Sequence, residues 1–297
     1  MSQYICVDIG GTSIKHGVLD ENAIIKECNQ TKTEAWLGGA AVLDKVKTIG
    51  KQYKEQYENI EGICISTAGM VDPEEGKIVF AGELMPDYTG TCIKKELEKA
   101  LEMPCEVEND VNCAGLAEYV SGSAKESHIM FCATVGTGIG GCAIVNGRVF
   151  HGASNSACEV GYIPMGDSDF QTLGASSILV RKVAEKTIEP LDMWDGKKIF
   201  ALAEKGDKVC ISAIKEMCDV LGKGLATICY VLNPDTIVLG GGIMVQKKIL
   251  ENEIRDSLNR YLRPILAEHL QVCFAEYGNE AGMVGALYNF QNKYGRK

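Results

Sequence analysis

The sequence predicts an α/β protein of two domains, each with a mixed sheet flanked by helices. Three observations support this fold class. The chain has 297 residues, and 46% of them are hydrophobic, so its length suits about two domains with a sizeable core. A strand–glycine–strand pattern occurs twice, and apolar residues at helical spacing follow the predicted strands.

The repeated pattern starts as CVDIGGT at residue 6 and as CATVGTG at residue 132, an offset of 126 residues. At this offset Gly10 corresponds to Gly136 and Val18 to Ile144. Each copy is expected to form a hairpin with a glycine turn, ending in a second polar turn. Glycine-rich hairpins are common, so coincidence is the alternative; the similar order of the elements that follow argues against it.

The remaining elements alternate between strands and helices. NIEGICISTAGMVD, MPCEVENDVN and PDTIVLGGGIM each contain a predicted strand, and a helix is expected from near Val111. Helical spacing marks residues 176–186 and 209–232. We expect an N-terminal domain of residues 1–117, completed by a helix at about 284–297, and a C-terminal domain of residues 118–283.

Composition narrows the functional classes. The net charge is -10, which would repel a phosphate backbone, so a nucleic-acid partner is not expected. The thirteen cysteines contain no C-x-x-C pair, and most are interpreted as small buried residues in a reducing compartment. Neither a signal peptide nor a membrane span is apparent. The prediction is a cytoplasmic protein without a membrane partner.

The glycine-rich turns predict an anion site, because free backbone N–H groups after a strand bind phosphate. A plain hairpin turn is the alternative for each motif taken singly. The chain has no G-x-x-x-x-G-K-[ST] motif, and the glycines at 136–141 lead into CAIVNG rather than a helix, which argues against a dinucleotide site. Two such hairpins, with the triple glycine at 240–242, fit a nucleoside triphosphate held between two lobes.

These motifs together resemble a known superfamily. DIGGT at 8–12, TVGTGIGG at 134–141 and GGG at 240–242 are similar to the phosphate and adenosine loops of the actin, sugar kinase and heat-shock chaperone superfamily. STAGMVDPEEG at 66–76, ENDVNCAGLAE at 108–118, EVGY at 159–162 and NEAGMVGAL at 279–287 resemble the ROK family of bacterial sugar kinases. The resemblance implies two actin-like (ribonuclease H-like) domains with a ligand cleft between them, and a homodimer is expected.

Asp110 is the predicted catalytic residue. A carboxylate at a strand end can accept a proton from a substrate hydroxyl, and the alternative is an aspartate that caps the helix near Val111. The resemblance favours the catalytic role. It also implies that the sugar is bound by Asn109, Asp110, Glu159 and Tyr162, with Gly69 approaching through its backbone. Cys158 is interpreted as inert.

The resemblance implies ATP and Mg²⁺ as cofactors. Asp8 would orient Mg²⁺ waters around the phosphates. The remaining nucleotide contacts are assigned to residues of the glycine loops: Gly10, Gly11, Thr12, Thr134, Gly136, Thr137, Gly138, Gly241 and Gly242. Lys15 is left out of the site as a solvated strand residue. The histidines at 128, 151 and 269 match no family position and are interpreted as structural or surface residues.

The chain departs from the common family pattern at one place. The usual members read E-x-G-H, followed by a cysteine-rich zinc segment, whereas this chain has Tyr162 and then IPMGDSDFQTLGASS, without cysteine or glutamate. This segment cannot supply the three or four ligands that zinc needs. We therefore predict that the protein has no structural zinc. The loss of the family glutamate, with Gly174 nearby, further predicts space near the anomeric end of the sugar.

The predicted activity is phosphorylation of the 6-hydroxyl of a hexose or β-glucoside, with sugars of the cellobiose type as the best candidates. N-acetylmannosamine kinase and glucokinase are alternatives within the family. A ROK repressor would need an N-terminal DNA-binding domain, and CVDIGGT begins already at residue 6. A sugar sensor without turnover is a further alternative, against which the presence of Asp110 argues.

Overall fold

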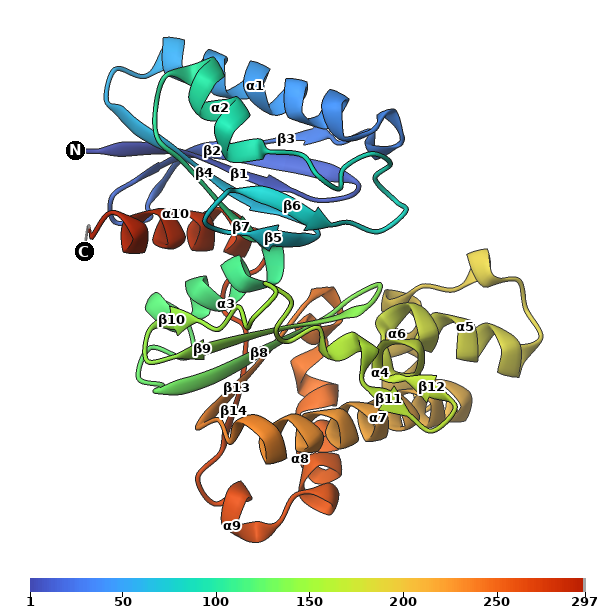
Figure 1. The fold of residues 1–297 in the computed structure, drawn as a ribbon. Coiled ribbons are helices and arrows are strands. Elements are labelled where there is room, and N and C mark those ends of the chain that lie inside the picture. Colours follow the sequence, from blue (N-terminus) through green and yellow to red (C-terminus); the bar gives the residue numbers. More distant parts are fainter. Residues whose placement is uncertain (296–297) are drawn as a thin grey trace. The chain divides into compact units, whose positions relative to one another are not determined.

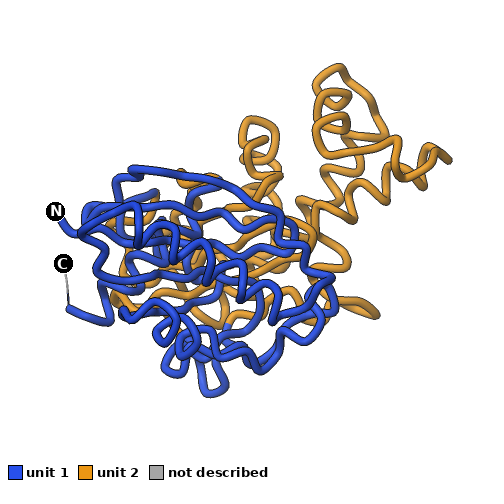
Figure 2. Tube along the Cα trace, turned by 90° about the horizontal axis from the view of Figure 1, so that it is seen from above, with its two compact units in different colours: residues 1–122, 151–157, 279–297 blue, residues 123–150, 158–278 orange. Residues whose placement is uncertain are grey.

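The computed structural model describes residues 1–295, which divide into two compact units (Figure 2). Unit 1 comprises residues 1–122, residues 151–157 and the described residues from 279 onward. Unit 2 comprises residues 123–150 and 158–278. The chain therefore leaves unit 1 and returns to it twice, the first time for a short segment of residues 151–157.

Unit 1 contains, within the described residues, a mixed five-stranded sheet of order β3-β2-β1-β4-β7. The strand bounds are β1 (Gln3–Ile9), β2 (Ser13–Asp20), β3 (Ile25–Lys32), β4 (Ile60–Thr67) and β7 (Cys105–Asn109). The first three strands are antiparallel neighbours, whereas β1, β4 and β7 run parallel. A small hairpin, β5 (Met70–Asp72) and β6 (Lys77–Phe80), follows β4. Because parallel strands share a direction, β1, β4 and β7 end at the same edge of this sheet.

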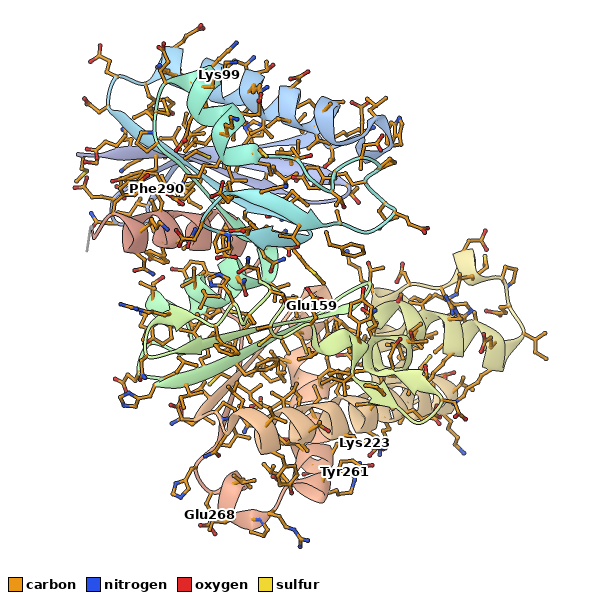
Figure 3. The ribbon with its side chains drawn as sticks, in the orientation of Figure 1. Lys99, Glu159, Lys223, Tyr261, Glu268 and Phe290 are labelled. Atoms are coloured by element: carbon orange, nitrogen blue, oxygen red, sulfur yellow. The ribbon has the colours of Figure 1, made fainter. Side chains whose placement is uncertain are left out.

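Helices cover both faces of this sheet (Figure 1). The helices of unit 1 are α1 (Gly39–Gln56), α2 (Ile93–Leu101), α3 (Asp110–Val120) and α10 (Ala281–Lys293), with a 3₁₀ turn η1 (Ala35–Leu37) before α1. Helices α1 and α2 lie on one face and α10 on the other. The ring of Phe290, labelled in Figure 3, lies 5.4 Å from that of Tyr4 in β1. The C-terminal helix is thus part of the core of unit 1.

Helices α3 and α10 of unit 1 pack closely because a glycine lies at their contact. A Cβ added at Gly285 would lie 1.7 Å from the backbone oxygen of Cys113. The two helices could not approach this closely with any other residue at position 285. This contact ties α10 to the helix that begins at Asp110.

Unit 2 contains a second five-stranded sheet within the described residues, of order β10-β9-β8-β13-β14. Its strands are β8 (Ile129–Val135), β9 (Ile139–Val145), β10 (Arg148–Val149), β13 (Thr236–Gly240) and β14 (Gln271–Phe274). A small hairpin pairs β11 (Pro164–Met165) with β12 (Ser168–Asp169). The helices are α4 (Phe170–Gly174), α5 (Ser176–Thr187), α6 (Gly196–Glu204), α7 (Lys208–Leu232), α8 (Lys247–Tyr261) and α9 (Pro264–Ala267). The 3₁₀ turns are η2 (Val160–Tyr162), η3 (Leu191–Met193) and η4 (Gly242–Gln246).

The two sheets repeat one design, which confirms the predicted fold class. Each has an antiparallel hairpin continued on one side by a third antiparallel strand and on the other by two parallel strands. Strand β1 shifted by the offset of 126 residues has the bounds of β8, and the two strands share the same sequence of buried positions. Each unit also has its own hydrophobic core.

All thirteen cysteines are free thiols, and nine of them are buried, as the apolar surroundings of most of them predict. Those in β1, β4 and β7 fill the core of unit 1 beside larger aliphatic side chains. Among residues 1–295, no helix combines the length and the apolar character that a membrane crossing requires.

Candidate active site

Asp8 lies near the end of β1, with its carboxylate largely buried. The hydroxyl of Ser66 donates a hydrogen bond of 2.7 Å to Asp8 Oδ1, and Lys15 Nζ lies 3.9 Å from Oδ2. Burial raises the pKa of Asp8, although Ser66 and Lys15 both act to lower it. Gly282, in the first turn of α10, lies against the same carboxylate, because an added Cβ would be 2.5 Å from Asp8 Cγ.

The turn after Asp8 contains Gly10, Gly11 and Thr12, all assigned to phosphate binding. Gly10 N–H donates to the backbone oxygen of Ser13 at 3.0 Å, which closes the turn between β1 and β2. Thr33, the residue after β3, stabilises this turn. Its hydroxyl donates to the backbone oxygen of Gly10 at 2.6 Å, and its N–H donates to the backbone oxygen of Thr12 at 3.1 Å. Gly11 and Thr12 are exposed, so their backbone groups are accessible to a ligand.

Asn109 caps helix α3. Its Oδ1 accepts hydrogen bonds from the N–H groups of Val111 at 2.9 Å and Asn112 at 3.1 Å, as N-cap side chains do. Its Nδ2 donates to the backbone oxygen of Gly69 at 2.9 Å and to Asp110 Oδ1 at 3.0 Å. The cap predicted as the alternative role for Asp110 is therefore made by its neighbour, which also holds the Asp110 carboxylate.

Asp110 is the first residue of α3 and follows β7 directly. Burial, followed by the negative charge of Asp8, raises the pKa of Asp110 to about 7. The N–H of Val111, which donates to Asp110 Oδ1 at 2.9 Å, and the amide of Asn109 act in the opposite direction. This carboxyl group can therefore gain or lose a proton near neutral pH.

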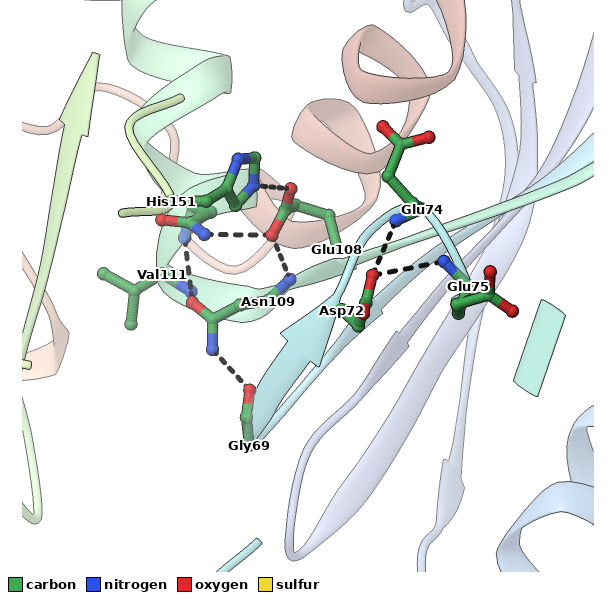
Figure 4. Close-up of polar contacts among 9 residues, drawn as sticks. Gly69, Asp72, Glu74, Glu75, Glu108, Asn109, Val111 and His151 are labelled. Carbon is green, nitrogen blue, oxygen red and sulfur yellow. Dashed lines mark hydrogen bonds and ion pairs between the residues drawn. The ribbon is translucent and has the colours of Figure 1, made fainter. Parts of the chain in front are cut away.

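Gly69 forms the turn between β4 and β5. Its φ of +99° is in the region that favours glycine, and a Cβ would lie 2.8 Å from the backbone oxygen of Phe80. Its carbonyl accepts the hydrogen bond from Asn109 (Figure 4). The STAG loop is thereby joined to the residues at the start of α3.

The glycine turn of unit 2 is anchored to helix α5. Gly136 N–H donates to the oxygen of Gly138 at 2.9 Å. The hydroxyl of Ser176 donates to the oxygen of Gly136 at 2.6 Å, and that of Ser177 to the oxygen of Thr137 at 2.8 Å. The turn is thus held rigid at the N-terminal end of a helix, an arrangement that suits the binding of an anion.

A cavity of about 560 Å³ opens beside this turn, entirely within unit 2. One part is polar and includes the glycine turn and the start of α5, whereas the other is apolar. The lining residues are Gly136, Thr137, Ser176, Ser177, Val180, Asp195, Gly196, Lys197, Phe200, Gly242, Ile243, Val245 and Gln246. Its size and mixed lining suit a small molecule with an anionic part and a flat apolar part.

The triple glycine after β13 borders this cavity. Gly240 is the partner of Thr134 in the parallel ladder between β13 and β8. Gly241 has a φ of +96°, and a Cβ there would lie 2.3 Å from the oxygen of Val135. Gly242 lines the cavity itself and begins η4. The backbone of this loop therefore passes close to the strand that carries Thr134.

Glu159 and Tyr162 lie on one short 3₁₀ turn of unit 2. The carboxylate of Glu159, labelled in Figure 3, has no hydrogen-bond partner among residues 1–295, and partial burial raises its pKa. The Tyr162 side chain is 57% exposed. Glu159 is the N-cap of this turn, with a non-helical ψ of 56°, and Tyr162 is the last residue of the turn.

The expectation that Gly174 opens space near a bound sugar is wrong. Gly174 is the last residue of α4 and is buried. A Cβ added there would lie 3.0 Å from Val220 and 3.3 Å from Ile139, closer than ordinary van der Waals contact, so these neighbours already fill the space beside Gly174. The sequence pattern could not show this, because Val220 lies far along the chain in α7. Any extra room must come from a different residue.

Within residues 1–295, no three His, Cys, Asp or Glu side chains form a group that could hold a metal ion. In unit 1, the structure brings Asp8, Gly69, Asn109 and Asp110 to the edge of the sheet where the parallel strands end. In unit 2, it brings Gly136, Thr137 and Gly242 to the cavity. Thr134, Gly138 and Gly241 are neighbours of these residues in the chain or the sheet but do not line the cavity.

Several residues of these sites carried no clear sequence signal. In the sequence, Ser176 and Ser177 indicate only the start of a helix, and the apolar residues that line the cavity resemble ordinary core residues. Lys15, left out of the site, donates to the backbone oxygen of Asn279 at 3.0 Å and lies beside Asp8. Glu108 and His151 extend the network around Asn109.

Comparison with known proteins agrees with this geometry. The sequence model of the ROK family matches residues 4–293. An uncharacterized protein of Clostridium perfringens is 44% identical over 297 residues, which is 100% of both chains. The beta-glucoside kinase of Klebsiella pneumoniae is 30% identical over 295 residues, covering 97% of this chain and 95% of that protein.

A solved structure extends the agreement to the fold. The ROK family glucokinase of Streptomyces griseus, in complex with glucose and AMPPNP, has a TM-score of 0.82 at 28% identity, and the match covers 97% of this chain and 98% of that one. Its similarity includes both units of the present chain. The family match, the shared fold and the paired glycine turns lead to one conclusion: the chain belongs to the ROK family and is a sugar kinase with the actin-like fold.

Proposed function

We propose that the enzyme transfers the γ-phosphoryl group of ATP to the 6-hydroxyl of a hexose or β-glucoside. The observation that carries this proposal is Asp110, a half-buried carboxylate at the start of α3 whose pKa is raised to about 7 by desolvation and by the charge of Asp8. A base is most efficient when its pKa lies near the working pH. Asp110 accepts the hydroxyl proton while the sugar oxygen bonds to the γ-phosphorus, and the bond from that phosphorus to the β,γ-bridging oxygen breaks to release ADP.

In this proposal Asn109 orients the base more than it binds the sugar. Both polar atoms of its amide already have partners, which are the helix N-terminus, the Gly69 carbonyl and Asp110. The amide donates to Asp110 Oδ1, which leaves Oδ2 for the reacting hydroxyl. Glu159 accepts hydrogen bonds from further hydroxyls, since its carboxylate has no partner among the described residues.

The cavity of unit 2 is the proposed site of the nucleotide. The N–H and hydroxyl groups at Gly136, Thr137 and the start of α5 suit the phosphates. The apolar part suits a purine ring, which would lie among Val180, Phe200, Ile243 and Val245. In the same proposal, the turn at Gly10–Thr12 of unit 1 contacts phosphate through its exposed backbone.

Asp8 is the proposed protein ligand for Mg²⁺, which would neutralise phosphate charge. Mg²⁺ keeps most of its waters and needs one or two carboxylates when phosphates supply the other ligands, so one buried aspartate fits its requirements. A cation would also relieve the repulsion between Asp8 and Asp110. Hydrogen bonding from Ser66 holds the Asp8 carboxylate in one orientation.

For the acceptor we propose a β-glucoside of the cellobiose type. Two observations support it: relatives in Klebsiella pneumoniae and Listeria monocytogenes, each 30% identical, are named beta-glucoside kinase, and an exposed Tyr162 replaces the histidine of the common family pattern. Glucose and N-acetylmannosamine are the alternatives.

We also propose that the enzyme is a homodimer in the cytoplasm. Light scattering measures the mass of the assembly and thereby tests the dimer.

The test is an ADP-release assay across glucose, N-acetylmannosamine, fructose, cellobiose and gentiobiose, with 6-deoxyglucose as the matched control that lacks the acceptor hydroxyl. We expect the highest kcat/KM with cellobiose or gentiobiose and no turnover of 6-deoxyglucose. Activity on glucose with none on the disaccharides would reject the β-glucoside assignment. No sugar-dependent ADP release with any of them would reject the kinase reaction proposed here.

A further inference from the structure

The buried Glu108 and the half-buried His151 form a pair beside the proposed base (Figure 4). The Glu108 side chain is 1% exposed, and its Oε2 lies 2.7 Å from His151 Nε2. Its Oε1 accepts hydrogen bonds from the N–H of Asn109 at 2.7 Å and from the side-chain amide of Asn112 at 2.9 Å. One carboxylate therefore joins His151 to the backbone of the residue that precedes Asp110.

The chain of hydrogen bonds continues from Glu108 to Asp110. Glu108 holds the backbone N–H of Asn109, and the side chain of Asn109 donates to Asp110 Oδ1 at 3.0 Å. The same side chain caps α3 and holds the carbonyl of Gly69. Because a buried carboxylate is costly unless its oxygens are satisfied, loss of His151 would leave Glu108 Oε2 without this partner and free the carboxylate to rotate.

His151 begins the segment of residues 151–157, which belongs to unit 1 although the chain before and after it belongs to unit 2. The N–H of Ala157 donates to the backbone oxygen of His151 at 3.1 Å, which closes the segment into a loop. Glu159, the proposed sugar ligand, follows two residues after this loop ends. The pair with Glu108 thus attaches the chain leading to Glu159 to strand β7.

The surroundings favour the charged form of this histidine. The hydrogen bond that His151 donates to Glu108 raises the pKa of His151, burial lowers it, and the charges of Glu108, Glu74 and Asp72 raise it further. Asp72 and Glu74 lie on the adjacent β5–β6 hairpin, as Figure 4 shows. A protonated imidazole donates through Nε2, which gives the short contact to Glu108 a charge-assisted character.

We infer that His151 is a positioning residue for phosphoryl transfer: through Glu108 it fixes the backbone of Asn109, and hence the orientation of Asp110, while fastening residues 151–157 to β7. This inference rests on the proposed role of Asp110 as base. His151 acts through Glu108 and contacts no reacting atom in this account. A purely structural role would alter thermal stability and leave kcat unchanged.

The experiment measures kcat and both KM values for His151→Ala, His151→Gln and the matched control His269→Ala, which changes an exposed histidine of unit 2. We expect His151→Ala to lower kcat by about 10- to 100-fold, since small misplacements of reacting groups have effects of that size. The KM for ATP should stay within twofold of the original. His151→Gln, which keeps a neutral donor, should recover part of the lost kcat, and His269→Ala should match the unchanged enzyme.

A double-mutant cycle with Glu108→Gln separates positioning from independent effects. If His151 acts through Glu108, His151→Gln should lower kcat by a smaller factor in the Glu108→Gln variant than in the unchanged enzyme. A kcat within twofold of the original for both His151 variants, or strictly multiplicative effects in the cycle, would overturn the inference. His151→Gln decides the question if His151→Ala does not fold.

Failure of the proposed function has a different signature. Asp110→Asn with undiminished turnover would remove the assigned base whatever the His151 variants do. Full activity of the His151 variants together with an inactive Asp110→Asn would leave the base assignment in place and reject the positioning role alone.

Discussion

Gly282 lies so close to Asp8 that a Cβ at position 282 would be 2.5 Å from the Asp8 carboxyl carbon. The first turn of α10, far along the chain, therefore packs against the carboxylate of Asp8 near the end of β1. This contact explains why a glycine is needed in the NEAG motif of this chain, since any side chain would displace either the helix or Asp8.

We expect Gly282→Ala to lower kcat/KM at least about tenfold, because Asp8 or the first turn of α10 must move. Overpacking of this kind should also destabilise the fold by about 1–3 kcal/mol. The matched control is Gly278→Ala, where an added Cβ meets nothing within 4 Å. Kinetics with both variants and their thermal unfolding check the prediction, and equal behaviour of the two would contradict it.

Filling the cavity of unit 2 should weaken nucleotide binding. Val180 lines this cavity, so Val180→Trp is expected to raise the KM for ATP by about tenfold or more, which corresponds to about 1.4 kcal/mol. The control Val231→Trp places the same side chain at a position that is 85% exposed. Titration with a non-hydrolysable ATP analogue provides the measurement. Unchanged affinity in Val180→Trp would place the nucleotide elsewhere.

Tyr162 should influence the choice of sugar. Tyr162→His restores the residue of the common family pattern, and we expect the ratio of kcat/KM for cellobiose to that for glucose to fall by about tenfold. Tyr162→Phe keeps the ring and separates its contribution from that of the hydroxyl. Rates measured with both sugars for the three proteins test this. An unchanged ratio in both variants would remove Tyr162 from the specificity site.

Asp110 should reduce the stability of the enzyme above neutral pH. Its pKa is raised in the folded state to about 7 from an ordinary value of 3.8, so the folded protein binds more protons than the unfolded chain between these values. Stability from this group therefore falls as the pH rises from about 4 to 7. We expect Asp110→Asn to be more stable than the unchanged enzyme at pH 8, by up to about 4 kcal/mol, with little difference near pH 4.

Denaturant unfolding at the two pH values measures this difference. Asp207→Asn is the control, because Asp207 is an exposed N-cap of α7 and asparagine caps helices equally well. A variant Asp110→Asn that is less stable than the unchanged enzyme at pH 8 would show that the Asp110 charge is not costly in the folded state.

The sequence predicts local features of this fold well because they depend on nearby residues. The two glycine hairpins, the helix after Asn109 and the long helix α7 follow from turn residues and periodicity over short windows. The offset of 126 residues predicts the bounds of β8 from those of β1. The roles expected for Asp110, Asn109 and Glu159 follow from the family resemblance more than from local patterns.

Features that depend on distant residues could not be predicted in this way. His151 pairs with Glu108, which lies 43 residues earlier, and nothing in HGASNSA indicates that this segment joins unit 1. The sequence predicts space at Gly174, whereas Val220 of helix α7 packs against this position. The roles of Ser176 and Ser177 depend on their contacts with a turn 40 residues earlier.

Single-turnover phosphoryl transfer by Asp110→Asn measures whether Asp110 takes the proton from the sugar hydroxyl. With enzyme in excess over labelled ATP and saturating sugar, we expect the transfer rate to fall by about 100-fold or more, while ATP affinity is unchanged. In the unchanged enzyme the same rate should rise with pH through about 7, where Asp110 loses its proton. A transfer rate in Asp110→Asn within twofold of the unchanged enzyme would show that Asp110 is not the base.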